Sequence, residues 1–97
     1  MFYEVSRFSD CSNSETGECF ENARHVLFNP DTREIISYEE VCHYSKYGRL
    51  MYSSGMPKQL QNNVTLLGKI GSHEKYVTLR QKYQEARDAG IKCKKIA

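Results

Sequence analysis

The sequence predicts a small α+β domain, in which an antiparallel sheet of about four strands carries two helices packed on one face. Aromatic and β-branched residues gather in short segments of the first half, as they do in strands. A turn containing proline separates two of these segments, and the last quarter has apolar residues at helical spacing. With 97 residues and 39% hydrophobic content, the chain is expected to form a single domain over residues 1–97.

The N-terminal half contains three recognisable segments. Residues 2–8 are aromatic and β-branched and are expected to form the first strand. Residues 9–22 are polar and rich in turn formers, so they are expected to form an irregular loop. Residues 24–28 and 33–38 flank an Asn-Pro-Asp-Thr turn at residues 29–32, and this pattern predicts a β-hairpin.

A short helix is expected at residues 38–47. Ser37 and Glu40 have the spacing of a capping box, in which a hydroxyl and a carboxylate bind backbone N–H groups at the start of a helix. Helical spacing would also place Tyr38 and Cys42 on one apolar face. These two features together predict the first of the two helices.

The C-terminal half is expected to contain an irregular segment, a strand, a long helix and a terminal edge strand. Residues 53–63 mix glycine, proline, serine and asparagine and are expected to be irregular. Residues 64–70 are expected to form a strand, and the lysines of residues 91–96 are typical of a protected sheet edge. Residues 73–89 are expected to form the long helix, because apolar residues repeat there every three or four positions. This apolar stripe consists of Tyr76, Leu79, Tyr83 and Ala86.

The formal net charge of +2 hides two unlike halves. Residues 1–44 carry nine acidic and three basic side chains, a formal charge of −6. Residues 45–97 carry three acidic and eleven basic side chains, a formal charge of +8. This asymmetry favours a polyanionic partner for the basic half, unless the two halves fold against each other and neutralise their charges.

Tyrosines alternate with basic side chains in residues 44–58, which is typical of nucleic-acid-binding surfaces. Lysine and arginine neutralise phosphates, and tyrosine rings offer faces on which bases stack. We therefore expect a small non-enzymatic protein that binds DNA or RNA through its basic C-terminal half. The expected contact residues are Tyr44, Lys46, Tyr47, Arg49, Tyr52 and Lys58, with Lys69, Lys92, Lys94 and Lys95 as phosphate anchors.

The acidic segment of the first half supports an alternative hypothesis from another class. A small viral or mobile-element inhibitor or adaptor would dock on a host protein, for example a defence or transcription component, partly through residues 10–21. Its acidic side chains would bind a basic groove of that host protein. The expected partner-binding residues are Asp10, Glu15, Glu18 and Glu21.

The four cysteines raise the question of a metal site. Structural zinc sites usually contain two ligands about two to four residues apart, and no two cysteines have that spacing, so we expect no metal and no other cofactor. A zinc site made by Cys11, Cys19, His25 and either Cys42 or His43 stays open as an alternative. In the simpler interpretation Cys42 belongs to the core, and Cys11 and Cys19 are loop thiols that would form a disulfide only in an oxidising compartment.

We expect no enzymatic activity, because the sequence contains no glycine-rich phosphate loop and no hydrolase or metalloprotease motif. Cys42 and His43 would point in different directions on a helix, so they would not form a nucleophile–base pair. No apolar run is long enough to span a membrane, and the N-terminus lacks the layout of a signal peptide, so a cytoplasmic location is expected. The oligomeric state stays open.

Overall fold

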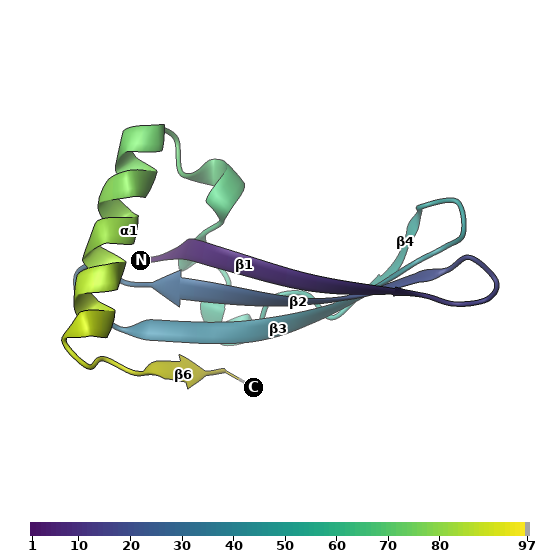
Figure 1. The fold of residues 1–97 in the computed structure, drawn as a ribbon, viewed down its shortest axis with the longest axis horizontal. Coiled ribbons are helices and arrows are strands. Elements are labelled where there is room, and N and C mark those ends of the chain that lie inside the picture. Colours follow the sequence, from purple (N-terminus) through teal and green to yellow (C-terminus); the bar gives the residue numbers. More distant parts are fainter. Residues whose placement is uncertain (97) are drawn as a thin grey trace.

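A mixed β-sheet of six strands is the frame of the protein in the computed structural model, which describes residues 1–96. The elements in chain order are β1 (Phe2–Asn13), β2 (Cys19–Phe28), β3 (Ile35–Tyr44), β4 (Leu50–Ser53), the 3₁₀ turn η1 (Lys58–Leu60), β5 (Val64–Thr65), the 3₁₀ turn η2 (Leu67–Lys69), α1 (His73–Asp88) and β6 (Cys93–Lys95). The order in the sheet is β4-β3-β2-β1-β5, and β6 pairs with β3 beside β4. Figure 1 shows that α1 crosses one end of this sheet.

Three consecutive antiparallel pairings, β1 with β2, β2 with β3 and β3 with β4, build most of the sheet. The turn between β2 and β3 has the predicted Asn-Pro-Asp-Thr sequence, and the Asn29 side-chain oxygen accepts the backbone N–H of Asp31 at 3.0 Å. The hairpin predicted at this place is therefore present. β5 and β6 pair in parallel with β1 and β3, which makes the sheet mixed.

The helix α1 covers one face of the sheet at the end that we call the covered end. Ser72 caps it, and its hydroxyl accepts the backbone N–H of Lys75 at 3.2 Å. The predicted apolar stripe of the helix faces the sheet, where the Tyr83 ring meets Phe28 edge-on with 6.0 Å between ring centroids. The buried cluster under the helix consists of Val5, Val26, Phe28, Ile35, Tyr83 and Ala86.

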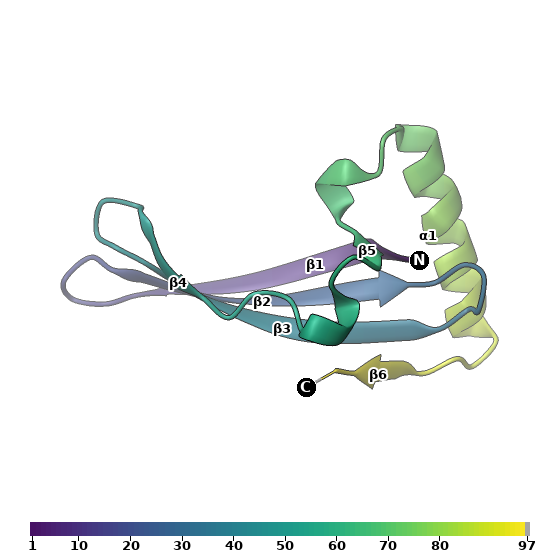
Figure 2. The ribbon, with the colours of Figure 1, turned by 180° about the vertical axis from the view of Figure 1, so that it is seen from behind.

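The chain between β4 and α1 covers the opposite face of the same end, as Figure 2 shows from behind. Leu60 of η1 is buried against this face, and β5 pairs with the first residues of β1. The second buried cluster consists of Phe2, Leu27, Ile36, Tyr38 and Leu60. The core of the protein thus lies in two thin layers on either side of the covered end.

Beyond the covered end, the sheet continues as a projecting arm, which we define as residues 8–24 and 39–53. Figure 1 shows the arm reaching away from α1, and the molecule measures 46 × 28 × 25 Å along its principal axes. No helix of residues 1–96 packs on the arm. An α-helix of 16 residues is the longest helix that the structure describes, and no helix in this part of the chain is long and apolar enough to cross a membrane.

The expectation of about four antiparallel strands with two helices on one face is wrong, because residues 1–96 form six strands and one α-helix. Residues 38–47 do not form a helix and lie largely in β3. Ser37 is buried within the sheet, and the Glu40 carboxylate binds His25 and Ser53 instead of capping a helix. Residues 38–44 pair with β2, and residues 42–44 also pair with β4, whereas a short isolated helix is only marginally stable, so the tertiary context overrides the local capping pattern.

Residues 9–22 were expected to form a loop, and this is also wrong, since only the turn at 14–18 is irregular. Most side chains of these strands point to solvent, so polar residues suit both faces and the apolar alternation of a half-buried strand is missing. Gly17 lies in this turn with a φ of 88°, a conformation that glycine adopts most readily.

The C-terminal half follows its expected order of elements with shorter strands. Residues 53–63 contain the single turn η1, and the strand expected at 64–70 is reduced to β5 followed by η2. The long helix lies at residues 73–88, within the predicted range. The terminal strand β6 lies at the sheet edge beside β3 and runs parallel to it.

Candidate functional site

The arm exposes large apolar side chains on the side of the sheet where α1 lies. Side chains alternate between the two faces of a strand, and Val26 of β2 packs under α1. The alternate residues that precede Val26, and the residues of β1 and β3 paired with them, therefore share that side. We call the apolar members of this surface the arm face: Phe8, Phe20, Val41 and Tyr52, which are 67%, 42%, 46% and 58% exposed.

The arm face continues from strand to strand. Phe20 of β2 lies opposite His43 of β3, which lies opposite Tyr52 of β4. The rings of Phe20 and His43 stack with 4.5 Å between their centroids. His43 Nε2 also lies 2.7 Å from a carboxylate oxygen of Glu18, which holds the imidazole in this position. Phe20, Val41 and Tyr52 thus lie around His43, whereas Phe8 lies among polar residues on the same side. Exposed apolar side chains gathered on one side of a sheet are typical of a docking site.

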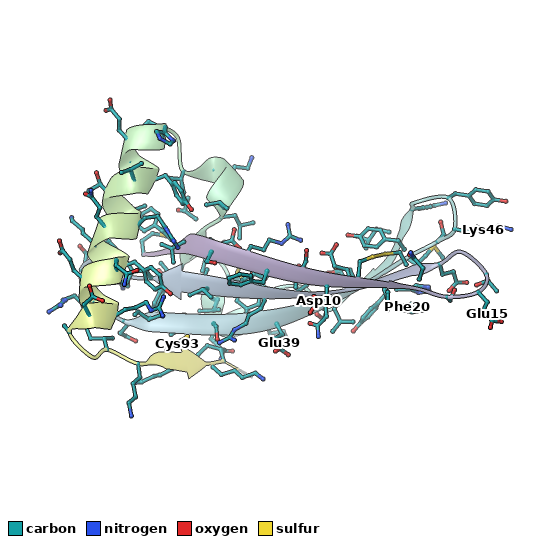
Figure 3. The ribbon with its side chains drawn as sticks, viewed as in Figure 1. Asp10, Glu15, Phe20, Glu39, Lys46 and Cys93 are labelled. Atoms are coloured by element: carbon teal, nitrogen blue, oxygen red, sulfur yellow. A yellow bond between two sulfur atoms is a disulfide. The ribbon has the colours of Figure 1, made fainter. Side chains whose placement is uncertain are left out.

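Charged groups of both signs border the arm face. A depression beside it is lined by Phe8, Asp10, Asn22, Arg24 and Glu39. Glu39 lies 3.6 Å from Lys95 Nζ, and Figure 3 shows Asp10 and Glu39 at the base of the arm. Apolar side chains flanked by both positive and negative groups are a common composition of protein–protein interfaces.

The turns of the two hairpins meet at the far end of the arm. Figure 3 shows Glu15 of one turn and Lys46 of the other at this end. A Cβ atom on Gly17 would lie 3.3 Å from the Cβ of Lys46, so the two turns are in contact. The acidic and the basic segment therefore adjoin at this end of the arm.

The ten predicted nucleic-acid contacts lie in four separate places. Five of them belong to β3, β4 and the turn between these strands: Tyr44, Lys46, Tyr47, Arg49 and Tyr52. Lys58 lies in η1 on the face opposite α1, and Lys69 lies in η2 beside β1. The last three, Lys92, Lys94 and Lys95, lie in β6 or just before it at the covered end. The structure thus gathers only the first five.

The four predicted partner-binding acids all belong to the hairpin of β1 and β2, and they point in different directions. Asp10 borders the arm face, and Glu15 lies in the turn. Glu18 binds His43, as described above. Glu21 lies on the opposite face of β2, where it forms an ion pair of 2.9 Å with Arg7.

Cys11 and Cys19 form a disulfide between β1 and β2, with 6.6 Å between their Cα atoms. The interpretation of these residues as loop thiols is therefore wrong, because the segment is a hairpin that brings them together. Cys42 is buried, as its assignment to the core requires. The zinc ligands left open by the sequence do not converge, and within residues 1–96 no group of three or more His, Cys, Asp or Glu side chains is arranged to hold a metal ion.

A buried polar cluster centred on His25 lies on the opposite face, at the base of the arm. His25 Nδ1 is hydrogen-bonded to the carboxylate of Glu4, and His25 Nε2 lies 3.3 Å from a carboxylate oxygen of Glu40. The imidazole stacks on the Tyr38 ring with 4.5 Å between centroids. The other oxygen of Glu4 accepts the backbone N–H of Leu67 at 3.0 Å, so the cluster links three strands to η2.

The hydrogen bond to Glu4 is the main reason why the pKa of His25 is raised above its ordinary value, although burial acts in the opposite direction. Burial would raise the pKa of Glu4, but the hydrogen bonds from His25 and from the Leu67 N–H outweigh it, and this pKa is lowered. Burial, together with the two nearby carboxylates, raises the pKa of Tyr38 to about 12. The cluster thus favours an imidazolium between two carboxylates. Arg7 and Lys69 line the same cleft.

The arm face and the His25 cluster were both missed by reasoning from the sequence. Phe8 precedes residues 9–22, which the polar composition predicts as a loop, and Phe20 lies within them, so their shared face has no detectable periodicity. Glu4 did carry a usable signal, because a lone carboxylate in an otherwise apolar strand needs a partner if its side is buried. That partner, His25, is distant in the sequence and could not be identified without the strand register.

Comparisons with protein-family models, with characterised proteins and with solved structures found no match to this chain.

Proposed function

We propose that this chain is a small non-enzymatic binding protein that docks on another protein through the arm face. The observation that carries the proposal is the exposure of Phe8, Phe20, Val41 and Tyr52 on one continuous side of a sheet. Burying such side chains against a partner removes apolar area from water, which is the dominant favourable contribution in most protein association. The bordering charges would then select the partner.

The construction of the arm supports this role. β1 and β2 pair along the whole arm, and the turns of its two hairpins are in contact. The stacked rings of Phe20 and His43 fix part of the surface before binding. A surface that is already ordered loses little conformational entropy when a partner binds.

The proposal follows the inhibitor or adaptor hypothesis, in which the protein is of viral or mobile-element type and acts on a host protein. The acidic residues of the first hairpin, among them Asp10 beside the arm face and Glu15 at the turn, would meet basic groups of that partner. Their contribution would lie mainly in partner choice and association rate.

The experiment is affinity capture from a lysate of the source organism, with the full chain as bait. The double substitution Phe8→Ser and Phe20→Ser should abolish capture of the specific partner and leave the fold intact, because both side chains are exposed. The matched control is Val77→Ser, which changes a 39% exposed apolar residue of α1, away from the arm. Nuclease treatment should not change the result.

Equal capture by the double variant and by the control would refute docking through the arm face. Charge reversal of Glu15 alone then separates the contribution of the turn from that of the arm face, because Glu18 binds His43 and is left unchanged. This charge reversal should reduce capture of the partner less than the double substitution Phe8→Ser and Phe20→Ser does, because exposed charges contribute little to affinity.

Nucleic-acid binding remains a second candidate, favoured by the turn between β3 and β4. Tyr47 is 85% exposed there, with Lys46 Nζ 5.1 Å from the centre of its ring, and Arg49 follows in the same turn. A ring and two cations suit a flipped base and its phosphates. Affinity for single-stranded or duplex DNA and RNA should then fall steeply with salt and vanish in the variant Lys46→Glu with Arg49→Glu. If that variant still binds nucleic acid, the turn between β3 and β4 is not the binding site.

A cytoplasmic location is part of the proposal, and the cysteine pair provides its test. In a reducing cytoplasm Cys11 and Cys19 would be thiols, whereas an oxidising compartment would keep the disulfide observed here. Thiol labelling of the protein immediately after lysis under acid quench distinguishes the two states. Complete protection of both cysteines would contradict the cytoplasmic location.

A further inference from the structure

The outer edge of β1 is open along the arm. β5 pairs with β1 only at Phe2 and Tyr3. From Ser6 to Asn13, β1 pairs with β2 on its inner side, and no strand of residues 1–96 pairs with its outer side. An edge of this kind presents backbone donors and acceptors that another strand can bind.

The register identifies the backbone groups that point outward. The Ser14 N–H donates to the Glu18 carbonyl at 2.9 Å, so these two residues form a hydrogen-bonded pair of the ladder. Hydrogen-bonded and non-hydrogen-bonded pairs alternate along antiparallel strands, so even-numbered residues of this part of β1 bond to β2. The residues whose N–H and C=O groups point outward are Arg7, Ser9, Cys11 and Asn13.

The covered end closes this edge at a defined residue. The carbonyl of Val5 accepts hydrogen bonds from Arg80 Nη1 at 3.0 Å and from the Tyr76 hydroxyl at 3.4 Å. Both donors belong to α1, so the helix occupies the edge as far as Val5. The open segment therefore begins at Arg7, next to the first residue of the arm, and continues along the arm to Asn13.

The two edges of the sheet differ in how well they are protected against pairing with a further strand. β4 and β6 both pair with the outer side of β3, and β6 carries Lys94 and Lys95, charges that oppose the addition of a further strand. Residues 6–13 of β1 contain no lysine and no proline, and the irregularity near Val5 lies before them. β4 has four residues and β6 three, and so short an edge strand is itself a poor template for pairing, so β1 is the long edge of the described sheet without lysine or proline beyond Val5.

We infer that the outer edge of β1, from Arg7 to Asn13, binds an extended basic segment of the protein partner, which adds a strand to the sheet. The inference rests on the proposed function and names the segment of the partner. Phe8 and Asp10 lie on the arm-face side of this edge. The added strand would therefore place an apolar side chain beside Phe8 and, two residues away, a lysine or arginine beside Asp10.

The charge of the hairpin selects this occupant over a second copy of the chain. Residues 6–24 carry four acidic and two basic side chains, a formal charge of −2. Pairing of two copies through this edge would bring two negative hairpins together, whereas a basic segment would meet opposite charge. A dimer formed through β1 is therefore an outcome that would overturn the inference.

The test uses the full chain and synthetic peptides of about eight residues, a common strand length. In the probe peptide every second residue is threonine, and the residues between the threonines are valine and lysine in turn. As a strand, the peptide would therefore have valine and lysine on one face and threonine on the other. One control peptide has glutamate in place of lysine, and the other has the same composition in scrambled order. Binding of the probe should slow hydrogen exchange at the amides of Arg7, Ser9, Cys11 and Asn13 about tenfold or more, and the controls should leave these amides unchanged.

The variant Ser9→Pro removes one outward N–H and no hydrogen bond to β2, so the edge strand should tolerate it. It should weaken binding of the probe about tenfold or more, whereas Ser9→Thr, which keeps the N–H, should bind like the unmodified chain. If Ser9→Pro fails to fold, the exchange pattern of the unmodified chain still decides the question. Unchanged exchange at the four amides, or protection of them in the protein alone at high concentration, would overturn the inference.

Capture of the natural partner separates this inference from the proposed function. Loss of capture in both Ser9→Pro and the Phe8→Ser, Phe20→Ser variant supports both. If Ser9→Pro still captures the partner and the Phe8→Ser, Phe20→Ser variant does not, docking through the arm face is supported and strand addition is refuted. Capture that survives both refutes the proposed function as well.

Discussion

The covered end and the arm belong to the same sheet but differ in what their residues pack against. At the covered end, α1 lies on one face and the chain between β4 and α1 on the other, so Leu27 and Phe28 are almost completely buried. In the arm, the same strands β1, β2 and β3 continue with exposed residues on the α1 side. The difference shows that strand formation and core formation are separate in this protein. The covered end supplies stability, and the arm supplies surface.

The largest effect is expected from removal of a core side chain at the covered end. Phe28 is 1% exposed and packs against Tyr83, so Phe28→Ala should lower the free energy of unfolding by about 3–5 kcal/mol. The matched change in the arm, Phe20→Ala, should cost less than about 1 kcal/mol, because the ring is partly exposed. Urea denaturation of both variants measures the two values. Similar losses would mean that the arm is part of the core.

The next effect concerns the buried cluster of His25 and Glu4. The substitution Glu4→Gln removes the negative charge that pairs with His25. It should lower the free energy of unfolding by about 3 kcal/mol, which is in the range measured for broken buried ion pairs. Calorimetric or urea unfolding at pH 6 measures this loss. Glu18→Gln, which removes the partner of His43 in the arm, is the control and should cost less than about 1 kcal/mol.

The pH dependence follows from the directions of the two pKa shifts. The raised pKa of His25 gives stability that is complete below its ordinary value of 6.5 and is lost as the pH rises through the folded-state pKa. The lowered pKa of Glu4 gives stability that is present above its ordinary value of 4.5 and is lost as the pH falls. Glu4 and His25 therefore together favour maximal stability between pH 4.5 and pH 6.5.

Urea denaturation across pH 5 to 9 tests this dependence, with each sample at one ionic strength. His25→Gln should remove the decrease at high pH, whereas His43→Gln in the arm should leave it in place because His25 is still present. A profile of His25→Gln that is parallel to that of the unmodified chain would contradict the assignment of the decrease to His25.

A smaller and local effect is expected from the disulfide of the arm. Cys11 and Cys19 are eight positions apart, and closing so short a loop stabilises a fold by about 2.5 kcal/mol. The double substitution to serine should speed hydrogen exchange in residues 9–22 and leave the amides of β2 near Leu27 unchanged. Equal acceleration in both regions would show that the arm and the covered end unfold as one unit.

The smallest effect on stability is expected at the arm face itself. Val41→Thr changes a 46% exposed side chain and should alter the free energy of unfolding by no more than about 0.5 kcal/mol. The same variant should weaken capture of the protein partner, because Val41 lies in the middle of the proposed docking surface. Thermal unfolding and capture measured on the same preparation separate the two effects.

The elements that could be predicted from the sequence are those with local signals. The Asn-Pro-Asp-Thr turn specified the hairpin around residues 29–32, and the apolar stripe specified α1. The segments predicted wrongly have local patterns that conflict with their environment. Ser37 and Glu40 resemble a helix cap, and the polar residues 9–22 resemble a loop, yet both segments are strands.

The amino-acid order alone determined one helix, one hairpin and the opposite charges of the two halves, because these depend on neighbours along the chain. The tertiary structure decided that β3 is a strand, that Cys11 meets Cys19, and that Glu4 and Glu40 enclose His25. It also decided that the predicted nucleic-acid contacts are divided among four places and that the arm face is exposed. These features depend on strand register and on which parts of the sheet are covered, and both result from contacts between residues far apart in the sequence.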